Sequence, residues 1–342
     1  MVLRHKYSHD DNKYFKTTAM HSEHQKPLKR ELQDLNEEDL KILKEEYNTY
    51  AFLVMKKDKI VIEKYFDDTT AKSTFNPFSA TKTIVSILFG IALDKQYITS
   101  IDDKVDKYFP TSGLANSTLK DVLRMESGLG LPYPHWLLTF GRDYFASNLT
   151  QRAEGLKPQY ESGKYWVYSN MNTQTISQVI ERATHLKLSQ FAQEHLWKYI
   201  STADAEWCMD ESDNVKAYCC FYMTSEDFLR LGKLVLDKGS FNNNQIISTE
   251  YLSKVFVADG TAQILVHNSS NIKNEWYGLQ GWRMSIDNHE VKYFSGIGGQ
   301  LVIIIEDLDL VISRFGFDKS VNLRRTVEPL VRRLVYVAEH YL

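Results

Sequence analysis

The stretch NPFSATKTIVSILFGIAL, from Asn76 to Leu93, decides which fold and which chemistry this chain is expected to have. Ser79 and Lys82 lie three residues apart where a long apolar segment begins. Residues with this spacing share one helix face, so the lysine amine can reach the serine hydroxyl. Apolar residues then follow on nearly every face, which predicts a buried helix from Ser79 to about Gln96.

A lysine beside buried helix surface suits proton transfer, because burial lowers its pKa and leaves the amine uncharged. A serine at a helix N-terminus also offers its backbone N–H to a developing oxyanion. The alternative is a serine helix cap followed by a surface lysine. Two further Ser-x-x-Lys copies, Ser117–Lys120 and Ser270–Lys273, lie in polar surroundings and open no long apolar helix.

A second motif, Tyr168-Ser169-Asn170, lies within GKYWVYSNMNTQ and is the only Tyr-x-Asn of the chain. A phenol near an amine can donate or accept a proton, and an asparagine amide can hold a substrate carbonyl. The alternative is a buried aromatic ring followed by a helix cap, since an amphipathic segment comes next.

A third motif, YFSGIGGQLVIII, places Gly296, Gly298 and Gly299 between two segments of high β propensity. Glycine inside a strand pattern indicates a bulge or the close approach of another backbone. A strand edge beside a nucleophile would supply an N–H to an oxyanion and would pair with an extended substrate. A glycine-rich hairpin turn explains the pattern equally well.

The three motifs, in this order, resemble those of the serine β-lactamase and penicillin-binding protein superfamily. The resemblance is to its class C β-lactamase-related branch, which includes esterases, D-aminopeptidases and 6-aminohexanoate-dimer hydrolases. It extends over roughly residues 45–340, with similar longer segments at Thr118–Leu129, Glu161–Glu181 and Tyr222–Gly239. It implies a β-lactamase/transpeptidase-like fold and a serine hydrolase that needs no metal or other cofactor.

The resemblance also implies roles for residues at matching positions. These are an acylated nucleophile, an activating lysine, a tyrosine that shares proton transfer and an asparagine that positions the substrate carbonyl: Ser79, Lys82, Tyr168 and Asn170. The backbone N–H groups of Ser79 and Gln300 would form the oxyanion hole. The motifs leave open whether Lys82 or Tyr168 is the general base.

One departure from the family pattern bears on the substrate. Where β-lactamases and DD-peptidases carry Lys-Thr-Gly or His-Thr-Gly, this chain has Ile297-Gly298-Gly299, so the cation that meets a substrate carboxylate is missing. Loss of such a charge-assisted hydrogen bond costs about 1.5–3 kcal/mol. The expected substrate is therefore a small ester or linear amide. The alternatives are a weak β-lactamase or D-amino-acid peptidase, and a catalytically silent binding or scaffold protein.

Strand patterns occur at both ends of the chain and helical patterns fill the middle. This predicts an α+β fold, with an antiparallel sheet flanked by helices from both termini and an inserted all-helical domain. The predicted division is a tail or arm over 1–35, a sheet domain over 36–112 and 213–342, and a helical domain over 113–212. The predicted strands are Tyr50–Met55, Ile60–Phe66, Leu279–Ile286, Val291–Ser295, Gln300–Glu306 and Leu310–Phe315.

Composition narrows the class of protein further. The net charge of −3 over 342 residues shows no excess of basic residues of the kind that nucleic-acid binding requires. No apolar run is long enough for a transmembrane helix, and no signal peptide is visible, which predicts a cytoplasmic protein unless a leader has been trimmed. The cysteines match no disulfide framework or zinc spacing, so reduced thiols are expected at Cys208, Cys219 and Cys220.

Several features stay open at this level. The oligomeric state is one. Four histidines in the first 35 residues could in pairs touch a metal, although a metal-free tail is the preferred interpretation: His5, His9, His21 and His24. The substrate pockets are expected in two loops, Leu131–Phe145 and Asp259–Tyr277.

Overall fold

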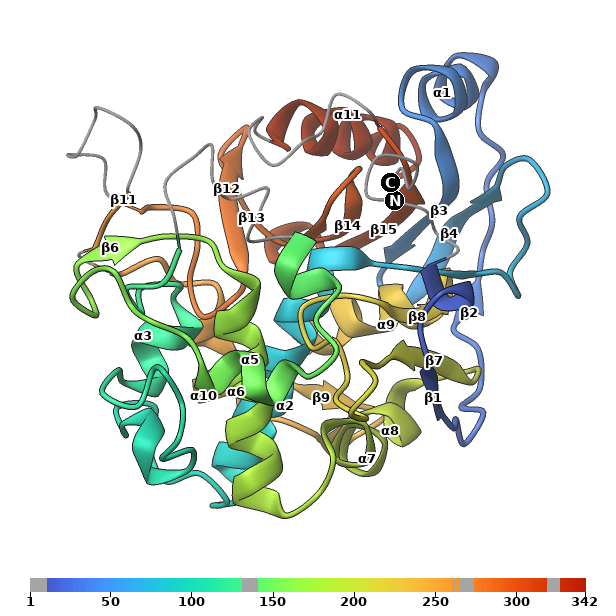
Figure 1. Ribbon diagram of the computed structural model, residues 1–342. Coiled ribbons are helices and arrows are strands. Elements are labelled where there is room, and N and C mark those ends of the chain that lie inside the picture. The colour runs from blue at the N-terminus through green and yellow to red at the C-terminus, as the bar shows by residue number, and fades with distance from the viewer. Residues whose placement is uncertain (1–10, 131–140, 261, 265–273, 319–326) are drawn as a thin grey trace.

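The computed structural model describes residues 11–130, 141–260, 262–264, 274–318 and 327–342. Within them, a seven-stranded sheet has the order β12-β13-β14-β15-β3-β4-β2 (Figure 1). All neighbours pair antiparallel except β2 and β4, which are parallel. The strands are β2 (Lys29–Arg30), β3 (Thr49–Lys56), β4 (Lys59–Tyr65), β12 (Trp282–Ile286), β13 (His289–Gly296), β14 (Gln300–Ile305) and β15 (Leu310–Gly316).

The central strands of this sheet are buried on both faces. Along β3, Leu53 and Met55 belong to one core cluster, whereas Phe52 and Val54 belong to the other. This alternation follows from the two-residue period of a strand. The first cluster includes α9 (Ser225–Leu236), and the second includes α11 (Glu328–Glu339) and the segment formed by α1 (Glu37–Lys41) and the π-helical turn Ile42–Glu46. The predicted α+β architecture, with a sheet built from both ends of the chain, is confirmed.

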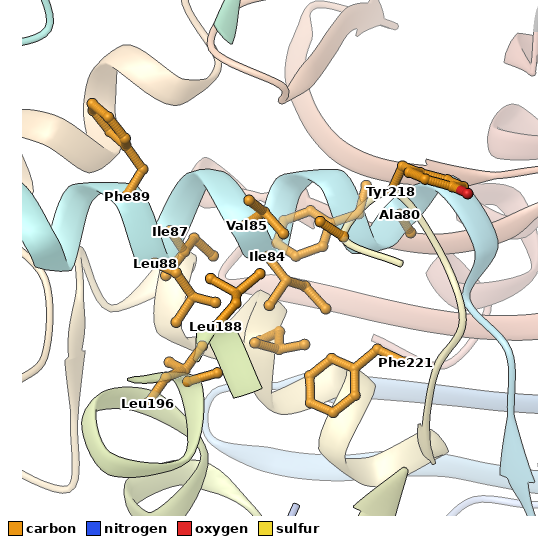
Figure 2. Packing of buried hydrophobic residues seen from close by; sticks show 14 of the residues in the cluster. Ala80, Ile84, Val85, Ile87, Leu88, Phe89, Leu188, Leu196, Tyr218 and Phe221 are labelled. Carbon is orange, nitrogen blue, oxygen red and sulfur yellow. The ribbon is translucent and has the colours of Figure 1, made fainter. Parts of the chain in front are cut away.

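Helix α2 (Thr81–Asp94) crosses the first core cluster and is preceded by the 3₁₀ turn Phe78–Ala80. Its apolar residues are buried around the whole helix, and Ile84, Leu88 and Phe89 are each 0% exposed (Figure 2). At Gly90, a Cβ atom would lie 2.2 Å from the ring of Tyr251, so a larger residue would force the neighbouring helix away. The predicted buried helix is therefore present, and its first turn is tighter than an α-helix.

The remaining helices occupy the middle of the chain, and several begin at a capping side chain. Thr118 accepts a hydrogen bond from the Asp121 N–H, and Thr224 accepts one from the Asp227 N–H. Such caps satisfy backbone donors that a helix leaves unpaired. These helices are α3 (Leu119–Leu123), α5 (Leu149–Glu154), α6 (Asn170–Thr184), α7 (Leu188–Ala192), α8 (Lys198–Ile200) and α10 (Thr249–Val255).

The remaining strands are short and form small sheets outside the seven-stranded one. A four-stranded sheet has the order β1-β7-β8-β5, and β6 pairs with β11. One core cluster extends through both the helical region and the large sheet. The domain boundaries at residues 112 and 212 therefore remain a prediction. The short strands are β1 (Thr17–Met20), β5 (Thr74–Phe75), β6 (Tyr165–Trp166), β7 (Ala205–Cys208), β8 (Phe221–Thr224), β9 (Ser240–Phe241), β10 (Asn244–Gln245) and β11 (Gln263–Ile264).

The described part of the N-terminal segment lies along the folded body as an arm. Strand β1 pairs with β7, and Arg30 forms ion pairs with Glu63 at 2.7 Å and Glu226 at 2.7 Å. His21 contacts Asp204, and His24 contacts the Thr202 carbonyl oxygen. His5 and His9 lie outside the described residues. No helix in the described ranges has the length and apolar character needed to span a bilayer.

The expectation of three reduced thiols is wrong for two of the cysteines. Cys219 and Cys220 form a disulfide, whereas Cys208 is buried and takes no part in a disulfide within the described chain. Spacing alone suggests no framework because the bridge joins neighbouring residues. It depends on a local turn in which Cys220 has a φ of 67°.

Candidate active site

The Ser79 hydroxyl lies on the 3₁₀ turn that joins β5 to α2. Phe78, the residue before it, has a φ of 46°, a left-handed conformation that costs a residue with a Cβ atom of the order of 1–3 kcal/mol. The Asn76 side chain stabilises this conformation by accepting a hydrogen bond from the Phe78 N–H at 2.8 Å. Ser79 itself is partly exposed, whereas its neighbours Phe78 and Ala80 are buried. The turn therefore presents a serine hydroxyl at the edge of the core.

Lys82 lies one helical turn further along, with its side chain 1% exposed. Its Nζ atom lies 3.1 Å from Ser79 Oγ and 3.2 Å from the carbonyl oxygen of Tyr218. Burial lowers the pKa of Lys82 well below its ordinary value, and the charge of Asp143 opposes this only in part. The predicted pairing of Ser79 with Lys82 is thus present in the structure, with an amine whose neutral form is favoured.

Tyr168 closes the group from a third element. It lies between β6 and α6, and Lys82 Nζ is 4.8 Å from the centre of its ring. Burial raises the pKa of the Tyr168 phenol, and its hydrogen bond with Ser79 opposes the shift. The phenol is therefore protonated at neutral pH. It can donate a proton or relay one, whereas Lys82 is better suited to accept one.

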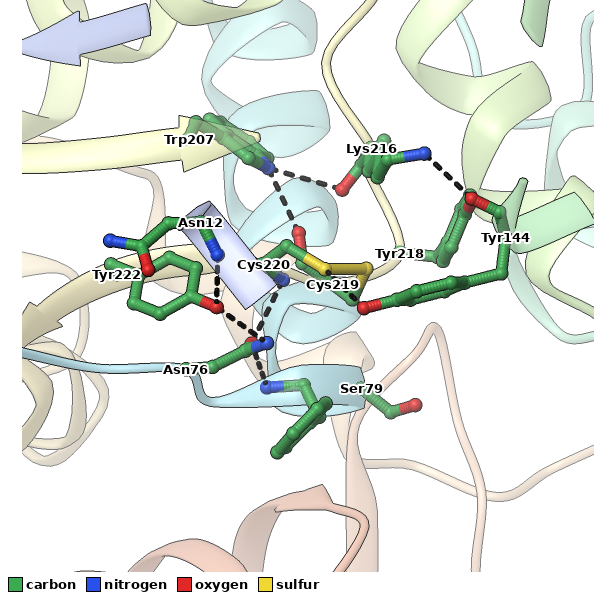
Figure 3. The surroundings of a disulfide bond; sticks show 12 residues. Asn12, Asn76, Ser79, Tyr144, Trp207, Lys216, Tyr218, Cys219, Cys220 and Tyr222 are labelled. Atoms are coloured by element: carbon green, nitrogen blue, oxygen red, sulfur yellow. Dashed lines mark hydrogen bonds between the residues drawn. A yellow bond between two sulfur atoms is a disulfide. The ribbon is translucent and has the colours of Figure 1, made fainter. Parts of the chain in front are cut away.

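The carbonyl that contacts Lys82 belongs to the loop Val215–Cys220. The Gln174 side chain donates to the Val215 carbonyl at 3.1 Å and accepts from the Ala217 N–H at 3.1 Å. The Trp207 indole N–H donates to the carbonyls of Lys216 and Cys219 (Figure 3). These bonds, with the disulfide, hold the loop on both sides of Tyr218.

The glycine motif forms a hairpin turn that also lies against the serine turn. Gly298 and Gly299 have φ values of 76° and 82°, which glycine adopts without strain. At Gly296, the last residue of β13, a Cβ atom would lie 2.1 Å from the Pro77 carbonyl oxygen. Both interpretations of this motif therefore apply: it is a hairpin turn, and one of its glycines permits close backbone approach.

Arg314 supports the turn from behind. It is fully buried, and its guanidinium donates to the carbonyls of Gly298 at 2.8 Å and Gly299 at 2.6 Å. Burial lowers the pKa of Arg314 to about 10, so the side chain stays charged at neutral pH. The charge of Asp318 opposes this fall in the pKa, while the two hydrogen bonds to carbonyls fix the conformation of the turn.

Gln300 follows the glycine turn directly, and Asn170 comes two residues after Tyr168. Gln300 pairs with Gly296, and its side chain donates to the Ile297 carbonyl at 3.0 Å and to the Gly316 carbonyl at 2.6 Å. Gln300 thus fixes the turn, while the β13 side of the turn faces Pro77. Asn170 is the first residue of α6, and Ser169 occupies the N-cap position. The interpretation of Asn170 as a helix cap is wrong.

Of the other two Ser-x-x-Lys copies, Ser117–Lys120 does not form a comparable pair. Ser117 Oγ contacts the carbonyl oxygen of Ser127 at 3.5 Å, and Lys120 lies 4.0 Å from Asp102. Ser270–Lys273 lies outside the described residues. What separates Ser79 from Ser117 is the apolar helix that follows, which buries the lysine.

Sequence reasoning missed several residues of this site. Asn76 contributes a side-chain oxygen that accepts from the Phe78 N–H, and Tyr218 contributes a backbone carbonyl that contacts Lys82. No sequence pattern predicts either contact. The third omission is the set of aromatic rings that form one contact group with the predicted Tyr168. We name it the aromatic cluster, and it consists of Trp166, Tyr168, Tyr277, Trp282 and Tyr293. The loops expected to form the pockets fall partly outside the described residues, at 131–140, 261 and 265–273.

Comparison with known proteins places the chain in a family. Residues 32–315 match the family model described as Beta-lactamase. The chain belongs to the beta-lactamase family. This match covers most of the chain and includes Ser79, Lys82, Tyr168 and the glycine turn, so it supports a serine hydrolase in the broad sense.

Solved structures confirm the fold of this beta-lactamase family member. A protein from Bacillus anthracis described as a 6-aminohexanoate-dimer hydrolase has a TM-score of 0.81 at 19% identity, over 99% of this chain and 94% of the other. A family VIII carboxylesterase gives 0.69 at 14% identity, over 91% and 99%. A protein from Bacteroides dorei DSM 17855 described as a beta-lactamase gives 0.71 at 17% identity, over 88% and 96%. At these identities the likeness is one of fold.

Proposed function

We propose that the protein is a serine hydrolase that cleaves a small ester or linear amide through an acyl-enzyme on Ser79. The observation that carries this proposal is the 3.1 Å contact between Ser79 Oγ and the buried Lys82 amine. A nucleophile and a base within hydrogen-bond reach, with a third group beside them, are the arrangement that covalent catalysis requires.

In the proposed reaction, neutral Lys82 accepts the Ser79 proton as Oγ forms a bond to the substrate carbonyl carbon. The oxyanion accepts hydrogen bonds from the Ser79 N–H and from a backbone N–H of the glycine turn, at Ile297 or Gln300. The proton passes from Lys82 to the leaving oxygen or nitrogen, with the Tyr168 phenol as relay, and the bond to the leaving group breaks. Water then attacks the acyl-enzyme by the same proton path and releases the acid and free Ser79.

Asn170 is proposed to hold the substrate carbonyl, and the backbone at Ile297, Gly298 and Gly299 to pair with an extended substrate. Ile297 supplies no charge for a substrate carboxylate, which supports a neutral ester or amide over a β-lactam. The likeness to proteins described as an aminohexanoate-dimer hydrolase and a carboxylesterase supports the same choice. The partly exposed rings of the aromatic cluster, Trp166, Tyr168 and Trp282, are proposed to contact an alkyl or aromatic leaving group.

The first prediction is that Ser79→Ala abolishes hydrolysis of p-nitrophenyl esters and labelling by a fluorophosphonate, because both require the Ser79 oxygen. Ser117→Ala serves as the matched control and keeps both reactions, since Ser117 contacts only a backbone carbonyl. Unchanged turnover by Ser79→Ala would refute the mechanism.

Trapping of the acyl-enzyme tests the substrate class. Intact mass is measured after exposure to an ester, a linear amide and a β-lactam, and peptide mapping locates the adduct. We expect an adduct on Ser79 with the ester or amide and little turnover of nitrocefin. Nitrocefin turnover equal to ester turnover would favour a β-lactamase instead, and failure of the fluorophosphonate to label wild-type protein would favour a silent binding protein.

A further inference from the structure

We propose that Asn76 is a positioning residue, which sets the geometry of the Ser79–Lys82 pair by holding two strained backbone turns with one oxygen atom. The inference rests on the proposed function, because it concerns the reactivity of the same serine. It assigns Asn76 no contact with substrate.

Asn76 is 0% exposed and lies three residues before Ser79. Its Oδ1 atom accepts hydrogen bonds from the Phe78 N–H at 2.8 Å and from the Cys220 N–H at 3.1 Å (Figure 3). Its Nδ2 atom donates a longer bond of 3.5 Å to the Tyr222 hydroxyl. One side chain thus joins two segments that are 144 residues apart in sequence.

Both residues that donate to Asn76 Oδ1 have left-handed backbone conformations. The φ angle is 46° at Phe78 and 67° at Cys220, and neither residue is glycine. Such conformations persist only where surrounding contacts hold them, and they concentrate at functional sites. Asn76 supplies a contact of this kind to each.

The two held residues flank the reactive pair. Phe78 immediately precedes Ser79, and Cys220 follows by two residues the Tyr218 carbonyl that contacts Lys82 Nζ at 3.2 Å. The Asn76 oxygen therefore links the backbone that carries the nucleophile to the backbone that orients its base. Without that oxygen, two buried N–H groups lose their acceptor, and both turns can relax toward ordinary φ values.

The experiment measures how fast, and how completely, a small fluorophosphonate labels Ser79 in Asn76→Ala. Labelling stoichiometry counts folded, competent molecules, whereas the second-order rate constant reports the reactivity of each one. We expect a rate constant about 10–100-fold below wild type, the effect of misplacing reacting groups by about 1 Å, while labelling still goes to completion. For ester hydrolysis, kcat falls and KM changes little, because Asn76 contacts no substrate.

Asn214→Ala is the matched control. Asn214 is a buried asparagine that precedes the same loop, and its side chain bonds to Thr150 and Asp210 but to neither strained residue. We expect a loss of thermal stability with a labelling rate constant near that of wild type. Tyr222→Phe removes the partner of Asn76 Nδ2 and the acceptor of the Asn12 N–H, but it leaves both bonds to Asn76 Oδ1 in place. It is expected to react near the wild-type rate.

Asn76→Asp keeps an oxygen in the same place, so both N–H bonds persist, but a buried carboxylate also raises the pKa of a nearby amine. Labelling of this variant is therefore followed against pH, and its high-pH plateau is expected near the wild-type rate. If Asn76→Ala does not fold, the aspartate variant by itself tests the inference. An aspartate variant that stays slow on the high-pH plateau, or an alanine variant that labels as fast as Asn214→Ala, would overturn the inference. If wild-type protein itself fails to label at Ser79, the proposed function fails, and that result is distinct from either of these.

Discussion

Two buried basic side chains near the site, Arg314 and Lys82, show how the residue type affects protonation. Arg314 keeps its proton at neutral pH because its pKa falls only to about 10 and its fork of donors meets several carbonyls. Lys82 has fewer acceptors and a compact charge, and burial lowers its pKa well below the ordinary value. The arginine therefore serves as a fixed support, whereas the lysine can exchange a proton.

The second prediction concerns the pH dependence of activity. Hydrolysis is expected to fall as pH drops through the lowered pKa of Lys82, because a protonated amine cannot accept the Ser79 proton. Lys82→Met is expected to lose about 10²–10⁴-fold in kcat, the usual effect of removing a general base. The measurement is kcat against pH, and an acid limb that survives unchanged in the residual activity of Lys82→Met would contradict the assignment.

The same pKa shift has a consequence for stability. The unfolded chain binds a proton at Lys82 up to about pH 10.4, whereas the folded protein releases it at lower pH. Between these two values the unfolded state holds more protons, so the wild-type free energy of unfolding rises with pH relative to Lys82→Met. Urea unfolding of both proteins at about pH 7 and 9 checks the sign.

At the scale of elements, the meeting of β13 with the 3₁₀ turn builds the site. Gly296 ends β13 where the backbone of Pro77 lies too close for any Cβ atom. Arg314 on β15 and Gln300 on β14 hold the turn that follows. Three neighbouring strands thus fix a backbone edge against the residue pair that carries the proposed chemistry.

The third prediction is that Gly296→Ala forces β13 and the serine turn apart. We expect the free energy of unfolding to fall by about 1–3 kcal/mol, as for overpacking of a core. We also expect the folded variant to hydrolyse esters more slowly than wild type, so the loss of activity exceeds the loss of folded protein. Gly141→Ala is the control, because a Cβ atom there meets nothing within 4 Å. Full activity in Gly296→Ala would show that the close approach is not needed.

At the scale of the whole molecule, the site joins distant parts of the sequence. Ser79 lies after the N-terminal strands, Tyr168 and Tyr218 flank the middle helices, and the glycine turn comes from the C-terminal strands. The N-terminal arm reaches the same region, since the Asn12 N–H donates to the Tyr222 hydroxyl at 3.0 Å. The site therefore depends on the complete chain fold.

The fourth prediction concerns the thiol content of the folded chain. Alkylation of denatured, unreduced protein is expected to modify one cysteine, Cys208, because the other two are joined. After reduction by a dithiol, all three cysteines should react. Peptide mass mapping distinguishes the sites, and alkylation of Cys219 or Cys220 without reduction would contradict the disulfide.

The sequence by itself determined the longer strands, the buried helix and the pairing of Ser79 with Lys82. The strands from Tyr50 to Phe66 and from Val291 to Phe315 followed from β propensity and turn residues, and the buried helix followed from its apolar run. The start of β12 was predicted three residues early, because Gln280 has a φ of 65° and interrupts the extended pattern. Spacing on one helix face was enough to bring Lys82 to Ser79, since that contact is local.

Only the tertiary structure decided the contacts between residues far apart in the sequence, which no pattern of side chains predicts. The Tyr218 carbonyl and the Asn76 oxygen act across more than a hundred residues, and any residue supplies a carbonyl. The disulfide arose from the turn at Cys220, and the close approach at Gly296 from the packing of β13 on the serine turn. Periodicity and propensity describe neighbours along the chain, whereas these contacts depend on which backbone surfaces folding brings together.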